Sequence, residues 1–258
     1  GSTYDFQRLS LGAGASGEAL FTASQYLNFL GSGSTTVTNV VTLRSVETAS
    51  FTFTDLPPSP ANFPTGRFGT FYSTVDRISI GDLSTTGLTG LLDFYLGHGD
   101  DLFDARAAIN VIFAQGAAGN DELRGGTAND HLDGGADNDL LVGGAGANTI
   151  LGGSGVDTLD YSGAVGGVDV GLNEGRALNN GYGALDIILG VENLTGSAYN
   201  DVLVGQAGAN IIFGGAGADY LIGLGGNDRL VGGAGMANTL PGGPGAAGCE
   251  GAAPGSTP

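Results

Sequence analysis

A nine-residue repeat constrains the fold of this chain more than any other feature. In copies such as residues 134–142 and 152–160, two glycines begin a short turn that ends at an Asp or Asn, and a large apolar residue follows two positions later. Glycine supplies the positive φ angles that a tight turn requires, and the last three residues can form one short strand. Stacked copies of such a repeat bury a continuous core, so the period predicts an all-β solenoid of parallel strands.

Each copy has one acidic or amide position and, two residues later, one inward apolar position. The acidic or amide position holds Asp101, Asn110, Asp121, Asp130, Asp139, Asn148 and Asp157 in a first block, and Asp201, Asn210, Asp219 and Asp228 in a second. The apolar position holds Phe103, Ile112, Leu123, Leu132, Leu141, Ile150, Leu159, Leu203, Ile212, Leu221 and Leu230. Within the first block only the step from Ile112 to Leu123 is longer than nine residues, and we assign the extra two to Ala114 and Gln115. The apolar positions predict the core.

Two repeats, or eighteen residues, close one coil, so residues eighteen apart should lie about 4.8 Å apart, the spacing of neighbouring strands. The predicted stacks are Asp121 with Asp139 and Asp157, Asn110 with Asp130 and Asn148, Asp201 with Asp219, and Asn210 with Asp228. Two carboxylates at that distance repel by roughly 1 kcal/mol in water and about 3.5 kcal/mol at an effective dielectric constant near 20. Each coil buries only a pair of large apolar side chains against this repulsion, each worth roughly 1.5–3 kcal/mol.

A divalent cation between adjacent turns would reverse the sign of the carboxylate interaction. Calcium takes about six to eight oxygen ligands, which Asp side chains and turn carbonyls can supply, and the sequence has no His or Cys cluster for a softer metal. We therefore predict several Ca²⁺ ions at the Asp and Asn positions named above, bound more weakly at Asn110, Asn148 and Asn210 because an amide carries no charge. The alternative is a metal-free glycine-rich solenoid in which Asp and Asn only form turns.

The charge balance narrows the choice of partners. The chain has 26 Asp and Glu residues against 8 Lys and Arg residues, a formal net charge of −18. This excess argues against nucleic acid and against an anionic membrane surface. No apolar run is long enough to span a bilayer, and the single Cys249 cannot form a disulfide within the chain.

The sequence offers no convincing catalytic motif. An H-E-x-x-H zinc motif and a G-x-S-x-G nucleophile motif are both absent, and His98 and His131 fall at variable positions of the repeat. Residues 12–17 match G-x-G-x-x-G, but the acidic residue that a dinucleotide site requires does not follow at the expected distance. We therefore predict no catalytic and no organic-cofactor residue.

The repeat divides the chain into five predicted segments. Residues 1–95 form a β-rich region of unknown role, in which 36–43, 49–54, 68–72 and 77–80 are predicted strands and 18–30 a helix. Residues 96–160 form the first block, 161–195 a connector with strands, and 196–240 the second block. Residues 241–258 are rich in Gly, Ala and Pro and are predicted to be disordered.

These repeats resemble the RTX (repeats-in-toxin, haemolysin-type) family over about residues 96–240, and residues 190–201 are similar to the phrase that often leads into a new RTX block. The resemblance implies a right-handed parallel β-roll, Ca²⁺ binding, type I secretion, folding on calcium binding after export, and a location outside the cell or on a bacterial surface. Two other functions stay open. The chain could be an accessory module of a secreted enzyme that modifies polysaccharides or hydrolyses its substrate, or a calcium-dependent adhesin or surface-layer protein that self-assembles or binds cell-surface polysaccharide.

Overall fold

The fold was taken from a computed structural model of the chain, which describes residues 91–235, 238–244 and 248–251 in full. Before residue 91 it describes the backbone of six short strands and the buried side chains of Ile78 and Ile80. The described residues contain strands and turns but no helix, so the all-β prediction is confirmed. They also contain no helix of the length and apolar character needed to cross a membrane.

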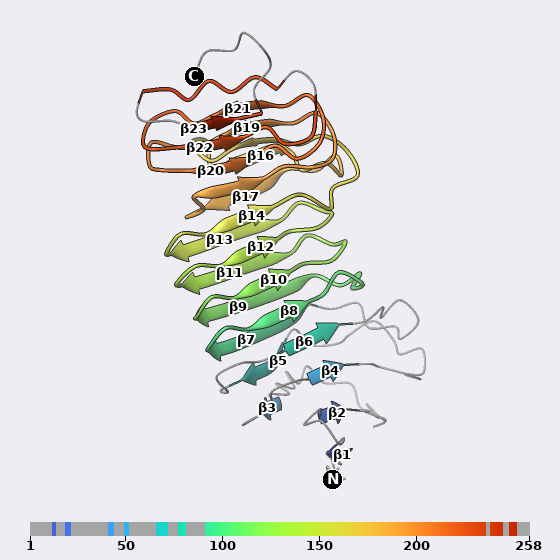
Figure 1. Ribbon diagram of the computed structural model, residues 1–258. Helices are drawn as coiled ribbons and strands as arrows, with labels where there is room; N and C mark the ends of the chain where they lie inside the picture. The colour runs from blue at the N-terminus through green and yellow to red at the C-terminus, as the bar shows by residue number, and fades with distance from the viewer. Residues whose placement is uncertain are drawn as a thin grey trace, which may run out of the picture.

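The strands form two long sheets that face each other along a solenoid (Figure 1). Sheet A contains, in spatial order, β1 (Gly12–Ala13), β2 (Ala19–Phe21), β4 (Ala49–Phe51), β6 (Arg77–Ile80), β8 (Leu102–Asp104), β10 (Glu122–Arg124), β12 (Leu140–Val142), β14 (Thr158–Asp160), β18 (Asn193–Thr195), β20 (Ile211–Phe213), β22 (Arg229–Val231) and β23 (Gly248–Glu250). Sheet B contains β21 (Tyr220–Ile222), β19 (Val202–Val204), β15 (Asp169–Gly171), β16 (Arg176–Asn179), β17 (Asp186–Leu189), β13 (Thr149–Ser154), β11 (His131–Ala136), β9 (Ile112–Ala118), β7 (Leu92–His98), β5 (Gly66–Phe71) and β3 (Val41–Leu43). The chain alternates between the sheets, so nearly all neighbouring strands are parallel.

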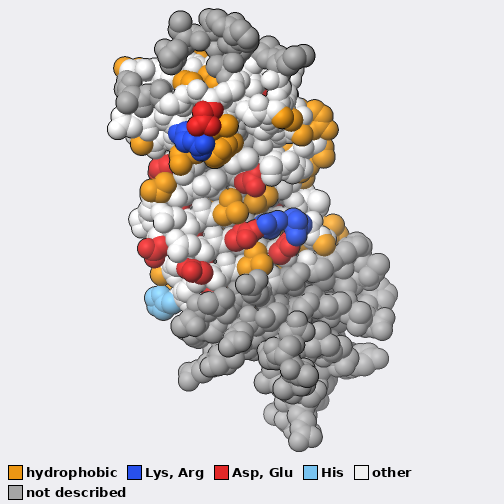
Figure 2. All heavy atoms as spheres, viewed as in Figure 1, with side chains coloured by type: hydrophobic (Ala, Val, Ile, Leu, Met, Phe, Trp, Pro, Cys, Tyr) orange, Lys and Arg blue, Asp and Glu red, His pale blue; other side chains and the backbone are white. Residues whose placement is uncertain are grey.

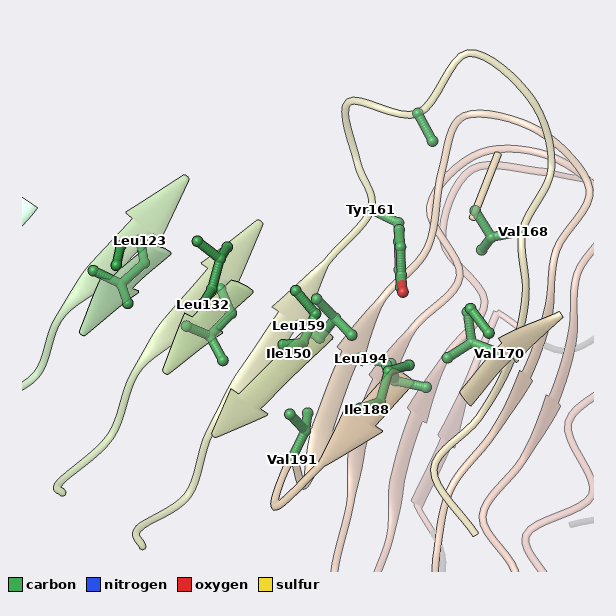
Figure 3. Close-up of a cluster of buried hydrophobic side chains, with 14 of the residues drawn as sticks. Leu123, Leu132, Ile150, Leu159, Tyr161, Val168, Val170, Ile188, Val191 and Leu194 are labelled. Carbon is green, nitrogen blue, oxygen red and sulfur yellow. The ribbon is translucent and has the colours of Figure 1, made fainter. Parts of the chain in front are cut away.

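The predicted apolar positions form the core. Leu123 pairs with Leu141 and Leu141 with Leu159 in sheet A, while Leu132 pairs with Ile150 in sheet B, in steps of eighteen residues. Every residue predicted at an apolar position is 0 % exposed. Figure 3 shows several of these side chains between the two sheets. The period therefore predicted both the pairing register and the inward face of the strands.

The extra two residues of the first block lie elsewhere than predicted. Leu132 pairs with Ala114, eighteen residues earlier, whereas Leu123 pairs with Phe103, twenty residues earlier. The additional residues therefore belong to the turn before β9, and Ala114 and Gln115 are ordinary members of that strand. The physical reason is that β9 pairs along its length with β7, from Leu92↔Ile112 onward, and a bulge inside β9 would interrupt that ladder.

The connector continues the solenoid. In sheet A, β14 pairs with β18 and β18 pairs with β20. In sheet B, the connector adds β15 and β16. β15 pairs with β16, and β16 pairs with β17, in both cases antiparallel. Val168, Val170, Ile188, Val191 and Leu194 are buried and extend the apolar core through this region (Figure 3). The two blocks therefore share one core.

The ends of the chain differ from the prediction at several residues. Ala19–Phe21, in the predicted helix of residues 18–30, form strand β2, and the rest of that segment lies outside the described residues. Strands β3 to β6 overlap the four strands predicted before residue 91. Gly248–Glu250, in the segment predicted to be disordered, form β23 and pair with β22, which places Cys249 against the core.

Candidate metal centre

The turns that lead into sheet A carry a continuous ladder of acidic side chains, which we call the first edge. The backbone N–H of each ladder residue donates to the carboxylate one coil further on: Asp101 to Asp121 Oδ1, Asp121 to Asp139 Oδ1, and Asp139 to Asp157 Oδ1, each at 2.8 Å. The Asp157 N–H then donates to Glu192 Oε2 at 2.9 Å. The predicted stack of Asp121, Asp139 and Asp157 is confirmed, and Asp101 and Glu192 extend it.

The turns that lead into sheet B form the second edge, in which carboxylates alternate with other groups. The Asp130 N–H donates to Asn148 Oδ1 at 2.9 Å, and the Asn148 N–H donates to Asp186 Oδ1 at 2.8 Å. The predicted place of Asn110 below Asp130 is wrong, because Asp130 Oδ1 accepts from the N–H of Ile112. The two extra residues of the preceding turn move Asn110 out of the eighteen-residue register.

The second block has the predicted pairs on both edges. The Asp201 N–H donates to Asp219 Oδ1 and the Asn210 N–H donates to Asp228 Oδ1, each at 3.0 Å. The Asp219 N–H continues the second edge to Asn238 Oδ1 at 2.9 Å, nineteen residues on because of the slip at residues 236 and 237. Both blocks therefore place their acidic positions in vertical ladders.

All the predicted site residues are buried, with at most 3 % of each residue exposed. In five of them the second carboxylate oxygen, Oδ2, accepts no hydrogen bond from the described part of the chain: these are Asp121, Asp139, Asp157, Asp219 and Asp228. A buried charged oxygen without a partner is costly, because the water that solvated it has been removed. The ladder therefore lacks a positive group at a repeated position.

Each of these oxygens lies in a cradle above the first glycine of its turn. A Cβ atom added to Gly134 would overlap Asp139 Oδ2 and lie 2.8 Å from the carbonyl oxygen of Gly152, one coil on. A Cβ atom on Gly214 would likewise overlap Asp219 Oδ2 and lie 2.8 Å from the carbonyl oxygen of Gly232. Because glycine has no side chain, a carboxylate oxygen and a carbonyl oxygen of the next coil can both lie where its Cβ atom would be.

Burial disfavours the charged form of the ladder carboxylates. It raises the pKa of Asp121 to about 8 and that of Asp139 to about 7, against the opposing effect of a backbone N–H donor and with a further contribution from neighbouring aspartates. Burial also raises the pKa of Asp130 to about 6. The pKa values of the remaining shifted ladder aspartates are raised above the ordinary value for the same reason, and these residues are Asp157, Asp186, Asp201 and Asp219.

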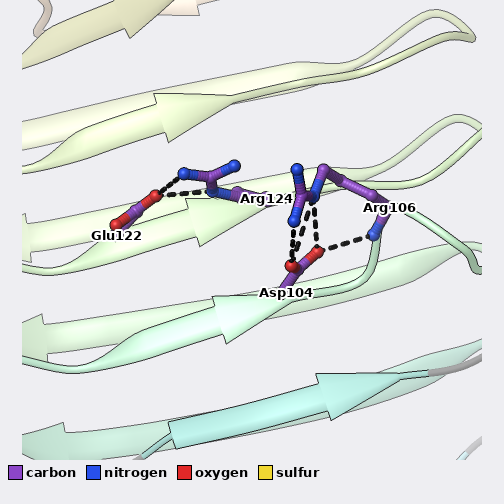
Figure 4. A network of polar contacts seen from close by, with 4 residues as sticks. All are labelled: Asp104, Arg106, Glu122 and Arg124. Atoms are coloured by element: carbon purple, nitrogen blue, oxygen red, sulfur yellow. Dashed lines mark hydrogen bonds and ion pairs between the residues drawn. The ribbon is translucent and has the colours of Figure 1, made fainter.

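The positive side chains of the described residues are engaged on the outer faces of the sheets. Arg106, in the turn after β8, pairs with Asp104 at 2.6 Å, and Arg124 pairs with Glu122 on β10 (Figure 4). Arg176 pairs with Glu174, and Arg229 with Glu250. Figure 2 shows arginines beside acidic side chains on the visible surface. A hydrogen bond from Arg106 lowers the pKa of Asp104, the opposite of what burial does to the ladder.

The donor set suits a hard cation that accepts main-chain ligands. Among the residues that the structure describes, no three His, Cys, Asp or Glu side chains converge to hold a metal. A cation here would be held by one or two carboxylate oxygens together with turn carbonyls. Calcium accepts such mixed oxygen shells, with flexible geometry and about six to eight ligands. The buried Oδ2 atoms and the glycine cradles therefore fit calcium.

Three ladder residues were missed from the sequence. Asp186 and Glu192 lie in the connector and Asn238 follows the slip at residues 236 and 237. Asp186 and Glu192 each stand two residues before a buried apolar side chain, Ile188 and Leu194, which is the spacing of the repeat. That spacing was the available signal, but these turns lack the glycine pairs that made the other copies visible.

The fold and the ladders define a parallel β-solenoid whose edges present buried acidic turns to a divalent cation. Among curated proteins, none matches the sequence significantly. The family model of the RTX calcium-binding nonapeptide repeat matches residues 115–150, 134–163, 189–221 and 204–235. Residues 115–163 and 189–235 are therefore RTX calcium-binding nonapeptide repeats, which confirms the family predicted from the sequence. This part of the chain is a calcium-binding RTX module.

Proposed function

We propose that the chain is a secreted module whose β-roll folds when calcium binds outside the cell. The observation that carries this proposal is the set of five buried Oδ2 atoms that accept no hydrogen bond from the described residues. They belong to Asp121, Asp139 and Asp157 on the first edge of the first block, and to Asp219 and Asp228 in the second block. We propose these carboxylates as calcium ligands, together with turn carbonyls.

Folding should depend on the cation because the ladder brings carboxylates close together, and their negative charge has to be neutralised. Closing each coil removes these side chains from water and places like charges one coil apart, at about the spacing between neighbouring strands. When bound, calcium supplies the positive charge and accepts the oxygen ligands that the turns present. Since a formed site does not exist in the unfolded chain, the free energy of calcium binding contributes directly to folding.

The coupling of folding to calcium binding also supports the proposal that the chain is secreted. Extracellular calcium-binding modules typically have dissociation constants of about 10⁻⁴–10⁻³ M, far above the calcium concentrations that intracellular sensors detect. A roll with sites of that affinity stays unfolded inside the cell and folds after export. The RTX repeats, which are typical of exported proteins, support an extracellular location.

Circular dichroism of the full chain tests this proposal. In chelator, we expect the β signal to be largely lost, and millimolar calcium should restore it, whereas the same concentration of magnesium should restore much less because magnesium prefers a rigid octahedral shell. Equal β content in chelator and in calcium would refute calcium-coupled folding.

A further inference from the structure

The ladder turns adopt two conformations, which differ at the second residue of the turn. Before Asp121, Asp139, Asp157, Asp219 and Asp228 that residue is Ala117, Gly135, Gly153, Gly215 and Leu224, with φ of 83°, 108°, 108°, 105° and 69°. In each of these five turns the carboxylate Oδ2 accepts no hydrogen bond from the described residues. Gly97, which stands in the same place before Asp101, also has a positive φ, of 104°. We call the five turns open turns.

In the other conformation, the turn satisfies its own side chain. The N–H of Gly126 donates to Asp130 Oδ2 at 2.7 Å, and the N–H of Ser197 donates to Asp201 Oδ2 at 2.6 Å. The N–H of Gln206 donates in the same way to Asn210 Oδ1 at 2.8 Å. None of these three second residues has a positive φ. We call these closed turns, because a backbone donor already occupies the oxygen that is free in an open turn.

Asn148 shows what faces that oxygen in an open turn. Its turn has a positive φ of 80° at Gly144, and the Asn148 amide Nδ2 points to the carbonyl oxygens of Gly144 and Gly146, at 3.4 Å each. The amide N–H groups thus occupy a cradle of carbonyl oxygens. By the equivalence of the repeats, an aspartate in an open turn directs an oxygen at such carbonyls, where only a cation or a proton gives attraction.

In two open turns the second residue has a positive φ although it is not glycine. Ala117 and Leu224 have side chains, and a left-handed φ brings their Cβ close to the backbone, which costs free energy. A right-handed φ at either residue would remove that cost. The open conformation is therefore retained by its surroundings, as is common where a strained backbone serves a ligand site.

The connector has a third arrangement, in which other side chains satisfy the ladder carboxylate. Tyr161 donates its hydroxyl to Asp186 Oδ2 at 3.0 Å, and Asn180 donates Nδ2 to Asp186 Oδ1 at 3.0 Å. Both oxygens of this buried carboxylate therefore have partners within the chain.

We propose that calcium is held by the five open turns, and that the closed turns at Asp130, Asp201 and Asn210, the Asn148 turn and the Asp186 turn complete their hydrogen bonding without metal. This rests on the proposed calcium function and assigns its sites. Three of the five open turns, those of Asp121, Asp139 and Asp157, lie one above the other on the first edge. In the first block, calcium then binds along the first edge and not along the second.

Matched Asp→Asn variants test this assignment. Asp139→Asn changes an open turn, and Asp130→Asn makes the same chemical change in a closed turn. Asn148 and Asn210 show that the ladder accepts an amide in either kind of turn. Calcium bound to the full chain at saturation is counted by equilibrium dialysis with calcium chloride, and the β signal that remains in chelator is measured separately by circular dichroism.

Asp139→Asn should lose at least one bound calcium and should keep more β signal in chelator than the unaltered chain, because its amide can donate where the carboxylate could not. Asp130→Asn should bind as many ions as the unaltered chain, and Asp201→Asn should do the same. Calcium loss in Asp130→Asn equal to that in Asp139→Asn would overturn the assignment while leaving calcium binding intact. An unaltered chain that binds no calcium would overturn the proposed function itself.

Discussion

The core register can be tested at two adjacent leucines of strand β12. Leu141 points inward, is 0 % exposed, and pairs with Leu123 below and Leu159 above. Leu140 is its chain neighbour on the outer face and is only partly buried. Leu141→Ala removes the equivalent of three carbon groups, worth about 2.4 kcal/mol at about 0.8 kcal/mol each. The cavity left in a stack with fixed spacing raises the expected loss to about 3–4 kcal/mol.

Leu140→Ala is the matched control and should cost less than about 1 kcal/mol, because most of what it removes is already near water. Both variants are unfolded with urea in saturating calcium and followed by circular dichroism at a β-sheet wavelength. A loss of about 3–4 kcal/mol is a large part of the stability of a typical domain, about 5–15 kcal/mol. Equal losses for the two variants, or a larger loss for Leu140→Ala, would refute the register, since a slip by one residue exchanges the two faces.

Two further predictions concern the turns. In calcium-free protein, Asp121 and Asp139 have folded pKa values of about 8 and about 7, above the value near 3.9 in an unfolded chain, so the folded roll binds more protons. The β signal in chelator should therefore be strongest near pH 4 and fall as the pH rises toward 8; a rise over that window would contradict the burial of these carboxylates. Ala117→Gly should raise the stability in calcium by about 0.5–1 kcal/mol, because glycine adopts the φ of 83° without strain, whereas the control Ala118→Gly, at a residue without a positive φ, should lower it. Urea unfolding measures both, and a loss in Ala117→Gly as large as in the control would show that the turn is not strained.

The regular part of the repeat was predictable because two repeats, or eighteen residues, make up one coil of the solenoid. A residue at a given phase meets its equivalent eighteen positions away, so the phase alone identified the inward column from Leu123 to Leu159 and the Asp121, Asp139 and Asp157 ladder. The prediction failed where spacing departed from nine. Ile112 and Ala114 are both buried, and only the pairing of β9 with β11 shows that Ala114 lies in the register of Leu132.

The connector and the tail were harder to predict for a different reason. Asp186 and Glu192 join the ladders without the glycine pairs that mark the other turns, and strand β17, which begins at Asp186, pairs with both β13 and β16. The strand at Gly248–Glu250 has little strand preference of its own. It forms because β22 offers an unpaired edge, which is a tertiary effect.

The order of residues along the chain was enough to determine the all-β solenoid, its apolar column and the choice of an oxygen-preferring dication, because each depends on a period or on side-chain chemistry. It could not distinguish Asp130 from Asp139, which occupy the same place in the repeat. Their environments differ because the backbone N–H of Gly126 reaches the first carboxylate, while Gly135 adopts a φ of 108° and the second carboxylate receives no such donor. That difference arises from the folding of each turn against its neighbouring coils, so only the tertiary structure decided which acidic turns have an Oδ2 without a hydrogen-bond donor among the described residues.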